Sequence, residues 1–148
     1  MLEQSFSEVY KKFKLRYYQN VFAHAPEREL SLTTTEAFCA EIIGALNNPT
    51  INEFASFINI SSPNATYRVN SLIQKGYIEK VQSETDKREY HLRTTEKYYK
   101  YYNISQSYVD VVLSRVRESC SPEEVEVFSR VLDKMNDELM PEVELRHS

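Results

Sequence analysis

Side chains suited to binding a polyanion occur in two groups between residues 62 and 88. The first group is the run from Ser62 to Arg68 (SPNATYR), which combines hydroxyl, amide, phenol and guanidinium groups. An Asn amide can pair with the edge of adenine, and an Arg guanidinium can bind guanine or a phosphate. The second group is the triplet Asp86-Lys87-Arg88, in which a carboxylate stands beside two cations. Taken singly, such residues also occur on ordinary solvated surfaces, so the elements that position them decide the interpretation.

The first group lies on a predicted helix over residues 62–75. We expect Ser62 to be its N-cap and Pro63 its first residue, where a missing N–H costs nothing. Gly76 is expected to end it. The apolar residues that the spacing buries are Ala65, Val69, Leu72 and Ile73. The opposite face then presents Asn64, Thr66, Tyr67, Arg68, Asn70, Ser71 and Lys75.

The neighbouring elements give this helix a recognisable setting. A short helix from residue 51 is predicted before it, with Thr50 and Glu53 at the spacing of a capping box and residues 59–62 as the break. Two strand candidates follow, residues 77–82 and 88–93, joined by the charged turn 83–87. The order indicates a helix-turn-helix followed by a hairpin wing. In that arrangement the second helix enters the major groove of DNA, and Arg88, oriented by Asp86, can enter the minor groove.

Charge is distributed in keeping with that interpretation, although the net charge is −4. Residues 61–100 hold 8 basic residues (Lys or Arg) and 5 acidic residues (Asp or Glu). Residues 101–148 hold 5 basic residues and 10 acidic residues. DNA affinity depends on the charge that faces the phosphates and not on the total.

Helices are predicted for most of the remaining chain, and its two glycines favour few tight turns. We expect helices over residues 2–22, 33–46, 95–119 and 121–139. Thr33 with Glu36 and Ser121 with Glu124 have capping-box spacing. The apolar stripe of the second helix is predicted to be Phe38, Ile42, Ile43 and Leu46, and that of the last Val125, Phe128, Leu132, Met135 and Leu139. The predicted fold class is mainly α with a small β-hairpin wing: a winged helix-turn-helix flanked by N- and C-terminal helices.

The segment from Ile60 to Thr95 resembles the MarR (multiple antibiotic resistance regulator) family. It is similar to that family's recognition helix, its Lys-Gly exit followed by hydrophobic residues, and its Asp-x-Arg wing. The resemblance extends over nearly the whole chain and implies a homodimeric, sequence-specific double-stranded DNA-binding regulator, a repressor by default. Carried over by position, the DNA-binding residues are Ser62, Pro63, Asn64, Thr66, Tyr67, Arg68, Lys87 and Arg88, with Asp86 orienting Arg88. Thr94 departs from the usual aliphatic residue, and Tyr67 stands where several members have Arg.

The resemblance also implies a layout for one MarR-like domain over residues 1–148. Residues 1–30 and 120–148 would be dimerisation helices, 31–95 the DNA-binding lobe and 95–119 a linking helix. The apolar stripes of the end helices favour the same dimer, because pairing with a second copy would bury them. The operator would be a pseudo-palindrome, since the dimer sets two recognition helices roughly 34 Å apart.

A small-molecule effector that lowers DNA affinity is a further expectation from the resemblance. Phe13, Tyr17, Phe38 and Tyr102 are the candidate lining residues, with core and interface packing as the alternative. Cys39 and Cys120 are expected to be reduced thiols, because they lie far apart in the sequence. Acidic residues near Cys39 disfavour a redox role for that thiol, and the sequence leaves a redox role of either cysteine open. His24, His91 and His147 are scattered, so no metal site is predicted.

Other classes of protein are disfavoured. The sequence has no HExxH, no GxSxG and no glycine-rich phosphate loop, so neither an enzyme nor a cofactor is expected. No apolar stretch is long enough to span a membrane, and the N-terminus lacks the pattern of a signal peptide, so a cytoplasmic location is expected. The alternative is a winged helix that contacts proteins without specific DNA binding; loss of the basic wing would favour it, and here Lys87 and Arg88 are present.

Overall fold

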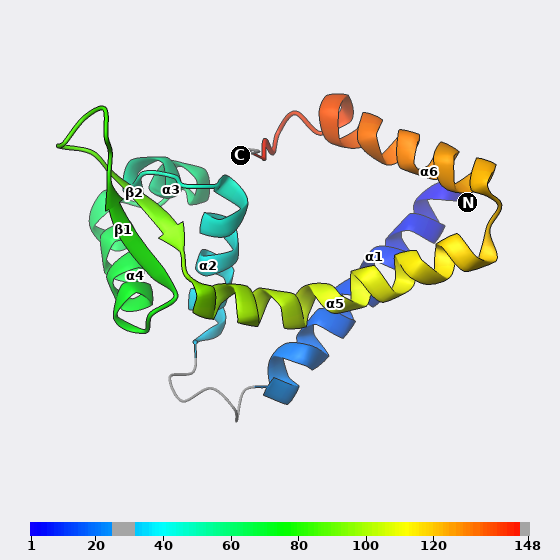
Figure 1. The fold of residues 1–148 in the computed structure, drawn as a ribbon, viewed down its shortest axis with the longest axis horizontal. Coiled ribbons are helices and arrows are strands. Elements are labelled where there is room, and N and C mark those ends of the chain that lie inside the picture. The colour runs from blue at the N-terminus through cyan, green and yellow to red at the C-terminus, as the bar shows by residue number, and fades with distance from the viewer. Residues whose placement is uncertain (25–31, 146–148) are drawn as a thin grey trace. The chain divides into compact units, whose positions relative to one another are not determined.

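The computed structural model describes residues 1–24 and 32–145, and the side chains of these residues except 21–24 and 101–106. Its elements are, in order, α1 (Leu2–His24), α2 (Thr34–Leu46), α3 (Ile51–Ile58), α4 (Ser62–Gln74), β1 (Ile78–Gln82), β2 (Tyr90–Thr94), α5 (Glu96–Ser119), α6 (Pro122–Lys134) and the π-helix η2 (Met135–Leu139). This confirms the predicted fold class, a mainly helical chain with one hairpin (Figure 1).

The chain divides into two compact units. One comprises Met1–Ala23 and Ile104–Glu144, and the other comprises His24–Asn103 with Leu145–Ser148. Helix α5 begins in the second unit and ends in the first. We call them the helical unit and the winged unit. The winged unit contains α2, α3, α4 and the hairpin, which lie together in Figure 1.

Side-chain caps begin the predicted helices. The capping boxes of Thr33 with Glu36 and of Thr50 with Glu53 are present at α2 and α3, and the same box begins α6. The expected cap of α4 was wrong by one residue: Ser61 Oγ accepts the N–H of Asn64 at 3.3 Å. Ser62 is instead inside the helix, because the extended backbone that a cap requires occurs at Ser61.

The core of the winged unit is formed where α2, α3, α4 and the hairpin meet. Its largest fully buried side chains include Phe54, Ile43, Leu72, Ile78 and Leu92. The core packs against one side of α4 and leaves the other side in solvent.

The predicted apolar stripe of α2 was partly wrong. Phe38 is 43 % exposed, whereas the smaller Ala37 and Ala40 are buried. The reason is close packing on the small-residue side: a Cβ on Gly44 would lie 2.7 Å from the hydroxyl of Tyr98, which is buried. A Phe ring has no room on that side of the helix.

The wing is an antiparallel hairpin in which Ile78 pairs with Thr94 and Gln82 with Tyr90. Its second strand begins at Tyr90, two residues later than predicted, because Glu89 donates its N–H to the carbonyl of Asp86 and so belongs to the turn. The middle of β2 is tied to the segment before α3: Leu92 N–H donates to Pro49 O at 2.8 Å, and Thr50 forms a bridge with His91.

The helical unit leaves many apolar side chains exposed. On α6 no residue is buried, and Phe128, Val131, Leu132 and, on η2, Leu139 are all exposed. On α1, Phe6, Val9 and Tyr10 are exposed as well. Phe13 packs edge-on against Tyr108 of α5 at 5.8 Å between ring centroids. Among the described residues, no helix is long and apolar enough to cross a membrane.

Candidate nucleic-acid interface

Helix α4 presents one continuous polar face to solvent. Ala65, Val69 and Leu72 are completely buried and fix the rotation of the helix. On the opposite side Tyr67 is 78 % exposed, more than any other aromatic side chain that the structure describes in the winged unit. The other exposed residues of α4 are Ser62, Pro63, Asn64, Asn70 and Gln74. The structure therefore places four of the predicted contact residues, Ser62, Pro63, Asn64 and Tyr67, on one open surface.

Two predicted contact residues lie at the edge of that surface. Thr66 and Arg68 are partly buried. Burial raises the pKa of the Cys39 thiol on α2, and the charge of the Arg68 guanidinium offsets part of that rise. Cys39 itself is buried, which agrees with an inert thiol.

Ser71 and Lys75 were expected on the outward face, and the structure places them elsewhere. Lys75 Nζ donates to Glu36 Oε1 at 2.8 Å, and Ser71 Oγ donates to Glu36 Oε2 at 2.8 Å. Glu36 is buried and also accepts the N–H of Thr33 at 3.1 Å. The carboxylate that completes the capping box of α2 thus also holds α4.

Glu36 has a strongly lowered pKa as a result. Burial alone would raise it, but the hydrogen bonds from Lys75, Ser71 and Thr33 outweigh burial and hold the pKa at about 2, compared with 4.5 for an ordinary glutamate. Sequence reasoning assigned Glu36 only to the capping box. A glutamate at N3 uses one carboxylate oxygen for the capping box, so its second oxygen can accept a hydrogen bond from another element. That second oxygen was the feature of the sequence that could have indicated a further partner.

The C-terminal end of α4 is fixed by Gly76 and Lys97. Gly76 has φ +85°, its N–H donates to Ile73 O, and Tyr77 N–H donates to Leu72 O, the two bonds of a Schellman motif. Lys97 Nζ donates to the carbonyl of Lys75 at 2.9 Å and lies 4.7 Å from the centre of the Tyr77 ring. This role of Lys97 could not be predicted from the sequence, because its partner is a backbone atom that no pattern marks.

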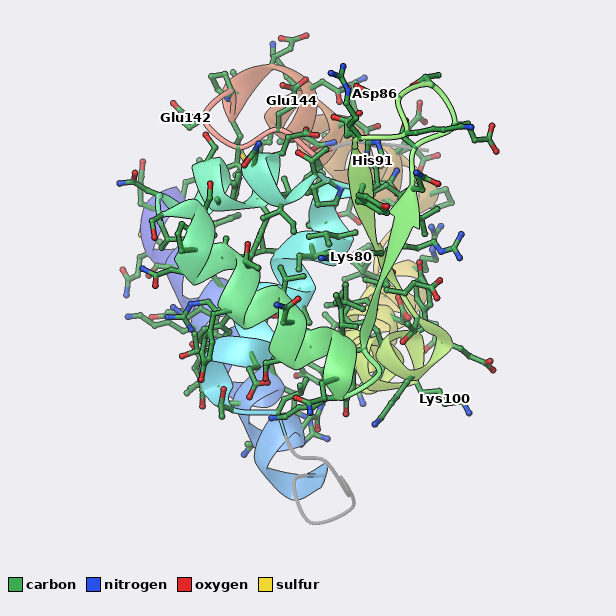
Figure 2. The ribbon with its side chains drawn as sticks, turned by 90° about the vertical axis from the view of Figure 1, so that its left-hand side faces the viewer. Lys80, Asp86, His91, Lys100, Glu142 and Glu144 are labelled. Atoms are coloured by element: carbon green, nitrogen blue, oxygen red, sulfur yellow. The ribbon has the colours of Figure 1, made fainter. Side chains whose placement is uncertain are left out.

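The tip of the wing holds a carboxylate–guanidinium pair. Asp86 Oδ1 accepts the backbone N–H of Arg88 at 3.0 Å and its Nε at 3.2 Å, and Nη2 lies 3.4 Å from Oδ2. The backbone hydrogen bond first, and then the side-chain bond, lower the pKa of Asp86. The Arg88 side chain is 92 % exposed. Figure 2 shows Asp86 in the loop between the strands, Lys80 on β1 and His91 on β2.

Further contacts stiffen the wing. Gln82 Nε2 donates to the carbonyl of Lys87 at 2.7 Å, which fixes the backbone of the turn while the Lys87 side chain stays exposed. Arg93 Nε donates to Glu79 Oε1 at 2.7 Å across the two strands. His91 Nδ1 donates to Asn48 O at 2.8 Å and holds the wing to the loop before α3. The tip cations Lys87 and Arg88 are therefore presented by a braced hairpin.

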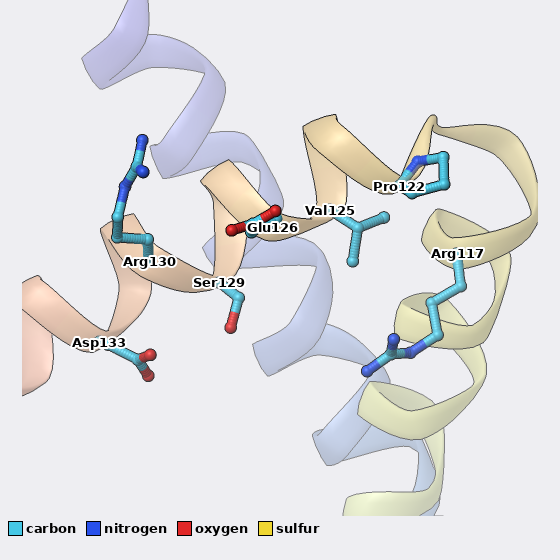
Figure 3. A pocket seen from close by; sticks show the side chains of 7 residues that line it. All are labelled: Arg117, Pro122, Val125, Glu126, Ser129, Arg130 and Asp133. Atoms are coloured by element: carbon cyan, nitrogen blue, oxygen red, sulfur yellow. The ribbon is translucent and has the colours of Figure 1, made fainter.

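The four predicted effector residues are not brought together within one unit. Phe13 and Tyr17 are in the helical unit and partly buried, whereas Phe38 is in the winged unit. Tyr102 lies outside the residues whose side chains the structure describes. A pocket of about 560 Å³ occurs in the helical unit between the end of α5 and α6 (Figure 3). It is lined by Arg117, Pro122, Val125, Glu126, Ser129, Arg130 and Asp133, none of which was predicted.

Metal ligands do not gather in the described part of the chain, where no group of three His, Cys, Asp or Glu side chains lies close enough to hold an ion. Cys120 is partly buried, and both cysteines are free thiols. Of the three histidines, His91 holds the wing to the loop before α3 through its bond to Asn48. The side chains of His24 and His147 lie outside those that the structure describes.

Comparison with known proteins finds a family model that matches part of this chain and solved structures that share its fold. The model of the MarR family matches residues 32–90. A MarR family protein from Bacillus stearothermophilus has the same fold, with a TM-score of 0.66, 20 % identity and coverage of 94 % of this chain and 93 % of that one. A search of curated proteins found no match.

Two further solved structures share the fold. Streptococcus pneumoniae FabT, solved in complex with DNA, has a TM-score of 0.62 and 20 % identity, covering 97 % of this chain and 100 % of that one. S. aureus MepR bound to ethidium bromide has a TM-score of 0.61 and 18 % identity, covering 94 % and 96 %.

Proposed function

This chain carries a MarR-family domain over residues 32–90 and has the winged helix-turn-helix fold of that family, and from this premise we propose that it is a sequence-specific double-stranded DNA-binding transcriptional regulator. The observation that carries the proposal is the open polar face of α4 in the same unit as a braced wing tipped by Lys87 and Arg88. A polar helix face that contacts only solvent would not need a neighbouring wing held in place by hydrogen bonds. The protein requires no catalytic group or cofactor for this role.

In the proposed complex α4 enters the major groove. Asn64 and Tyr67 meet base edges there, while Ser62 and the first N–H groups of α4 face a phosphate. Pro63 and Thr66 pack along the groove wall, and Arg68, at the edge of the face, reaches a phosphate. Lys87 and Arg88 approach the neighbouring minor groove, where narrow stretches attract cations.

The regulator acts as a homodimer on a pseudo-palindromic operator. The exposed apolar residues of α1, α6 and η2 support this assembly, since a second copy would remove them from water. In the layout proposed for residues 1–148, segments 1–30 and 120–148 dimerise, 31–95 binds DNA and 95–119 links the two. Two recognition helices about 34 Å apart then match successive major grooves.

In the proposed mechanism the dimer occupies a promoter in the cytoplasm and thereby represses transcription. A small-molecule effector then releases the dimer from the DNA. The MepR relative bound to ethidium bromide supports a small-molecule partner. Such an effector would shift affinity by about 1–3 kcal/mol. Phe13, Tyr17, Phe38 and Tyr102 remain the proposed lining residues.

Selection of bound fragments from the whole genome tests the proposal. Purified protein is incubated with sheared genomic DNA at physiological salt, and the retained fragments are sequenced. We expect a small set of promoter fragments that share an inverted repeat with about one helical turn between half-site centres. Retention of all fragments alike would contradict the proposal and favour a winged helix that contacts proteins.

A further inference from the structure

Helix α4 and strand β1 contact each other, and we propose that Lys80 and Tyr90, beside this junction, bind phosphates of the DNA backbone. The two residues then set the position of the duplex between α4 and the wing. This inference rests on the proposed function and adds to it two positioning residues that lie outside α4 and outside the tip of the wing.

The strand register places Lys80 and Tyr90 on one face of the hairpin. Lys80 stands directly opposite Leu92, and Tyr90 precedes Leu92 by two residues on the same strand. Successive side chains of a strand point to opposite faces, so these three share a face, and Ile78 belongs to it as well. Ile78 and Leu92 are buried in the core, whereas Lys80 and Tyr90 are exposed. The core-facing side of the hairpin, which we call its inner face, therefore carries an ammonium and a phenol where it leaves the core.

The Lys80 ammonium is available to bind an anion. Figure 2 shows Lys80 between α4 and the hairpin. Among the residues that the structure describes, Lys80 has neither a hydrogen bond nor an ion pair. Helix α4 contains no Asp or Glu. The acidic residue of the two strands, Glu79, lies on the opposite face and pairs with Arg93. No carboxylate of α4 or of the inner face thus competes with a phosphate for this cation.

Tyr90 supplies a second donor at the same place. It lies diagonally across the hairpin from Lys80, a spacing over which long side chains on one face reach each other. Its hydroxyl has no hydrogen-bond partner among the described side chains. A tyrosine hydroxyl is one of the donors that proteins use for DNA phosphates. The ammonium and the hydroxyl can therefore bind the same phosphate or two adjacent ones.

The proposed docking leads a DNA strand over this junction. Helix α4 lies in a major groove, and the tip of the wing approaches the neighbouring minor groove. One sugar-phosphate strand separates two neighbouring grooves, so it has to pass between α4 and the tip of the wing. The inner face of the hairpin packs with α4 in the core, so Lys80 and Tyr90 meet that strand from the wing side. A contact to the backbone fixes the register of the protein on DNA and carries no base preference.

Removal of each donor tests the inference on a duplex recovered from the genomic selection. Lys80→Gln removes one cation, and we expect binding about two- to fivefold weaker near physiological salt. The logarithmic dependence of its affinity on salt should be less steep by about one unit. Tyr90→Phe removes only the hydroxyl and should weaken binding without changing that slope. Fluorescence anisotropy at several salt concentrations measures affinity and slope, and both variants should still prefer this duplex to a scrambled one.

Neutral phosphates then locate the contact. A methylphosphonate replaces one phosphate at a time along the strand between the two grooves. We expect one or two adjacent replacements that weaken binding of the parent and leave binding of Lys80→Gln unchanged. The matched control is Lys100→Gln, which removes another exposed lysine of the winged unit, on α5. It should equal the parent in affinity, in salt slope and in its response to every methylphosphonate.

Two results would overturn the inference and leave the proposed function intact: parent-like affinity and slope for Lys80→Gln, or full sensitivity of this variant to every methylphosphonate. Parent-like affinity of Tyr90→Phe would remove Tyr90 from the contact. A parent protein that bound no duplex in preference to a scrambled one would overturn both the inference and the proposed function. Equal melting temperatures of the parent and the variants show that a loss of binding does not come from unfolding.

Discussion

At the scale of single residues, Arg88 is the sharpest test of the wing. Its guanidinium is exposed and its orientation is set by Asp86, so truncation should remove a DNA contact without disturbing the fold. We expect Arg88→Ala to keep the parent melting temperature and to lose about 1–3 kcal/mol of binding free energy per contact. Titration of operator DNA by fluorescence anisotropy measures the loss.

The matched control for that variant is Lys100→Ala, an exposed cation on α5 that Figure 2 shows at the opposite end of the winged unit from Asp86. It should bind like the parent. Parent-like binding by Arg88→Ala would mean that the wing tip does not contact DNA.

Glu36 makes a prediction about pH. Its pKa is lowered to about 2 in the folded chain, so the stability it supplies is complete above about pH 4.5 and is lost as the pH falls from there towards 2. This corresponds to roughly 3 kcal/mol, an upper value because Lys75 can turn partly to water. Glu36→Gln should lower the free energy of unfolding at pH 7 and flatten its decline between pH 5 and 2. Urea unfolding at several pH values measures both.

Glu79→Gln is the control for the pH experiment, because Glu79 pairs with Arg93 on the exposed wing. Such a surface pair is worth about 1 kcal/mol at most. If Glu36→Gln and Glu79→Gln had the same small effect at pH 7, the buried network would not hold α4 as described.

Residue contacts divide into those that sequence could anticipate and those that it could not. The Asp86–Arg88 contact was anticipated, because both partners belong to one tight turn. The partners of Ser71 and Lys75 were missed, because Glu36 lies far away in the chain and no periodicity of α4 reports it. The same limit explains Phe38, whose exposure depends on Tyr98 packing against Gly44.

At the scale of elements, the end of α4 depends on Gly76. Its φ of +85° is a left-handed conformation that side chains disfavour, while a Cβ would only touch Lys97 at 3.7 Å. The cost of Gly76→Ala is therefore backbone strain and not collision, and we expect about 1 kcal/mol of destabilisation. Thermal and urea unfolding measure it, and Gly76→Asn should recover part of the loss because Asn tolerates this conformation. If Gly76→Ala were as stable as the parent, a side chain at this position would not strain the left-handed backbone at the end of α4.

Element positions were predicted closely because their signals are local. Capping boxes and the glycine after α4 each occupy a few consecutive residues, and they set the helix boundaries to within one or two residues. The adjacent serines before α4 carry the same hydroxyl, so sequence alone could not choose Ser61 over Ser62. The start of β2 was misplaced because the turn at Asp86 extends into the predicted strand.

At the scale of the whole molecule, the exposed apolar face of α6 is the proposed contact between two copies of the chain. Phe128 and Leu132 are both exposed in the single chain. We expect the parent to sediment as a dimer and the double variant Phe128→Glu with Leu132→Glu to sediment as a monomer with weaker operator binding. A charge placed in an apolar interface is unpaired and costly. Glu126→Gln, an exposed position on the same helix, is the control and should remain dimeric. A monomeric parent would contradict the assembly.

The central claim is that the whole molecule binds double-stranded DNA by sequence, and one titration tests it most directly. Purified protein is titrated by fluorescence anisotropy against its own upstream intergenic DNA and against a scrambled duplex, each at several salt concentrations. We expect tight binding to the intergenic duplex alone, two chains per site, with affinity that falls steeply as salt increases. Equal, weak binding to both duplexes, together with no enriched site in the genomic selection, would contradict it.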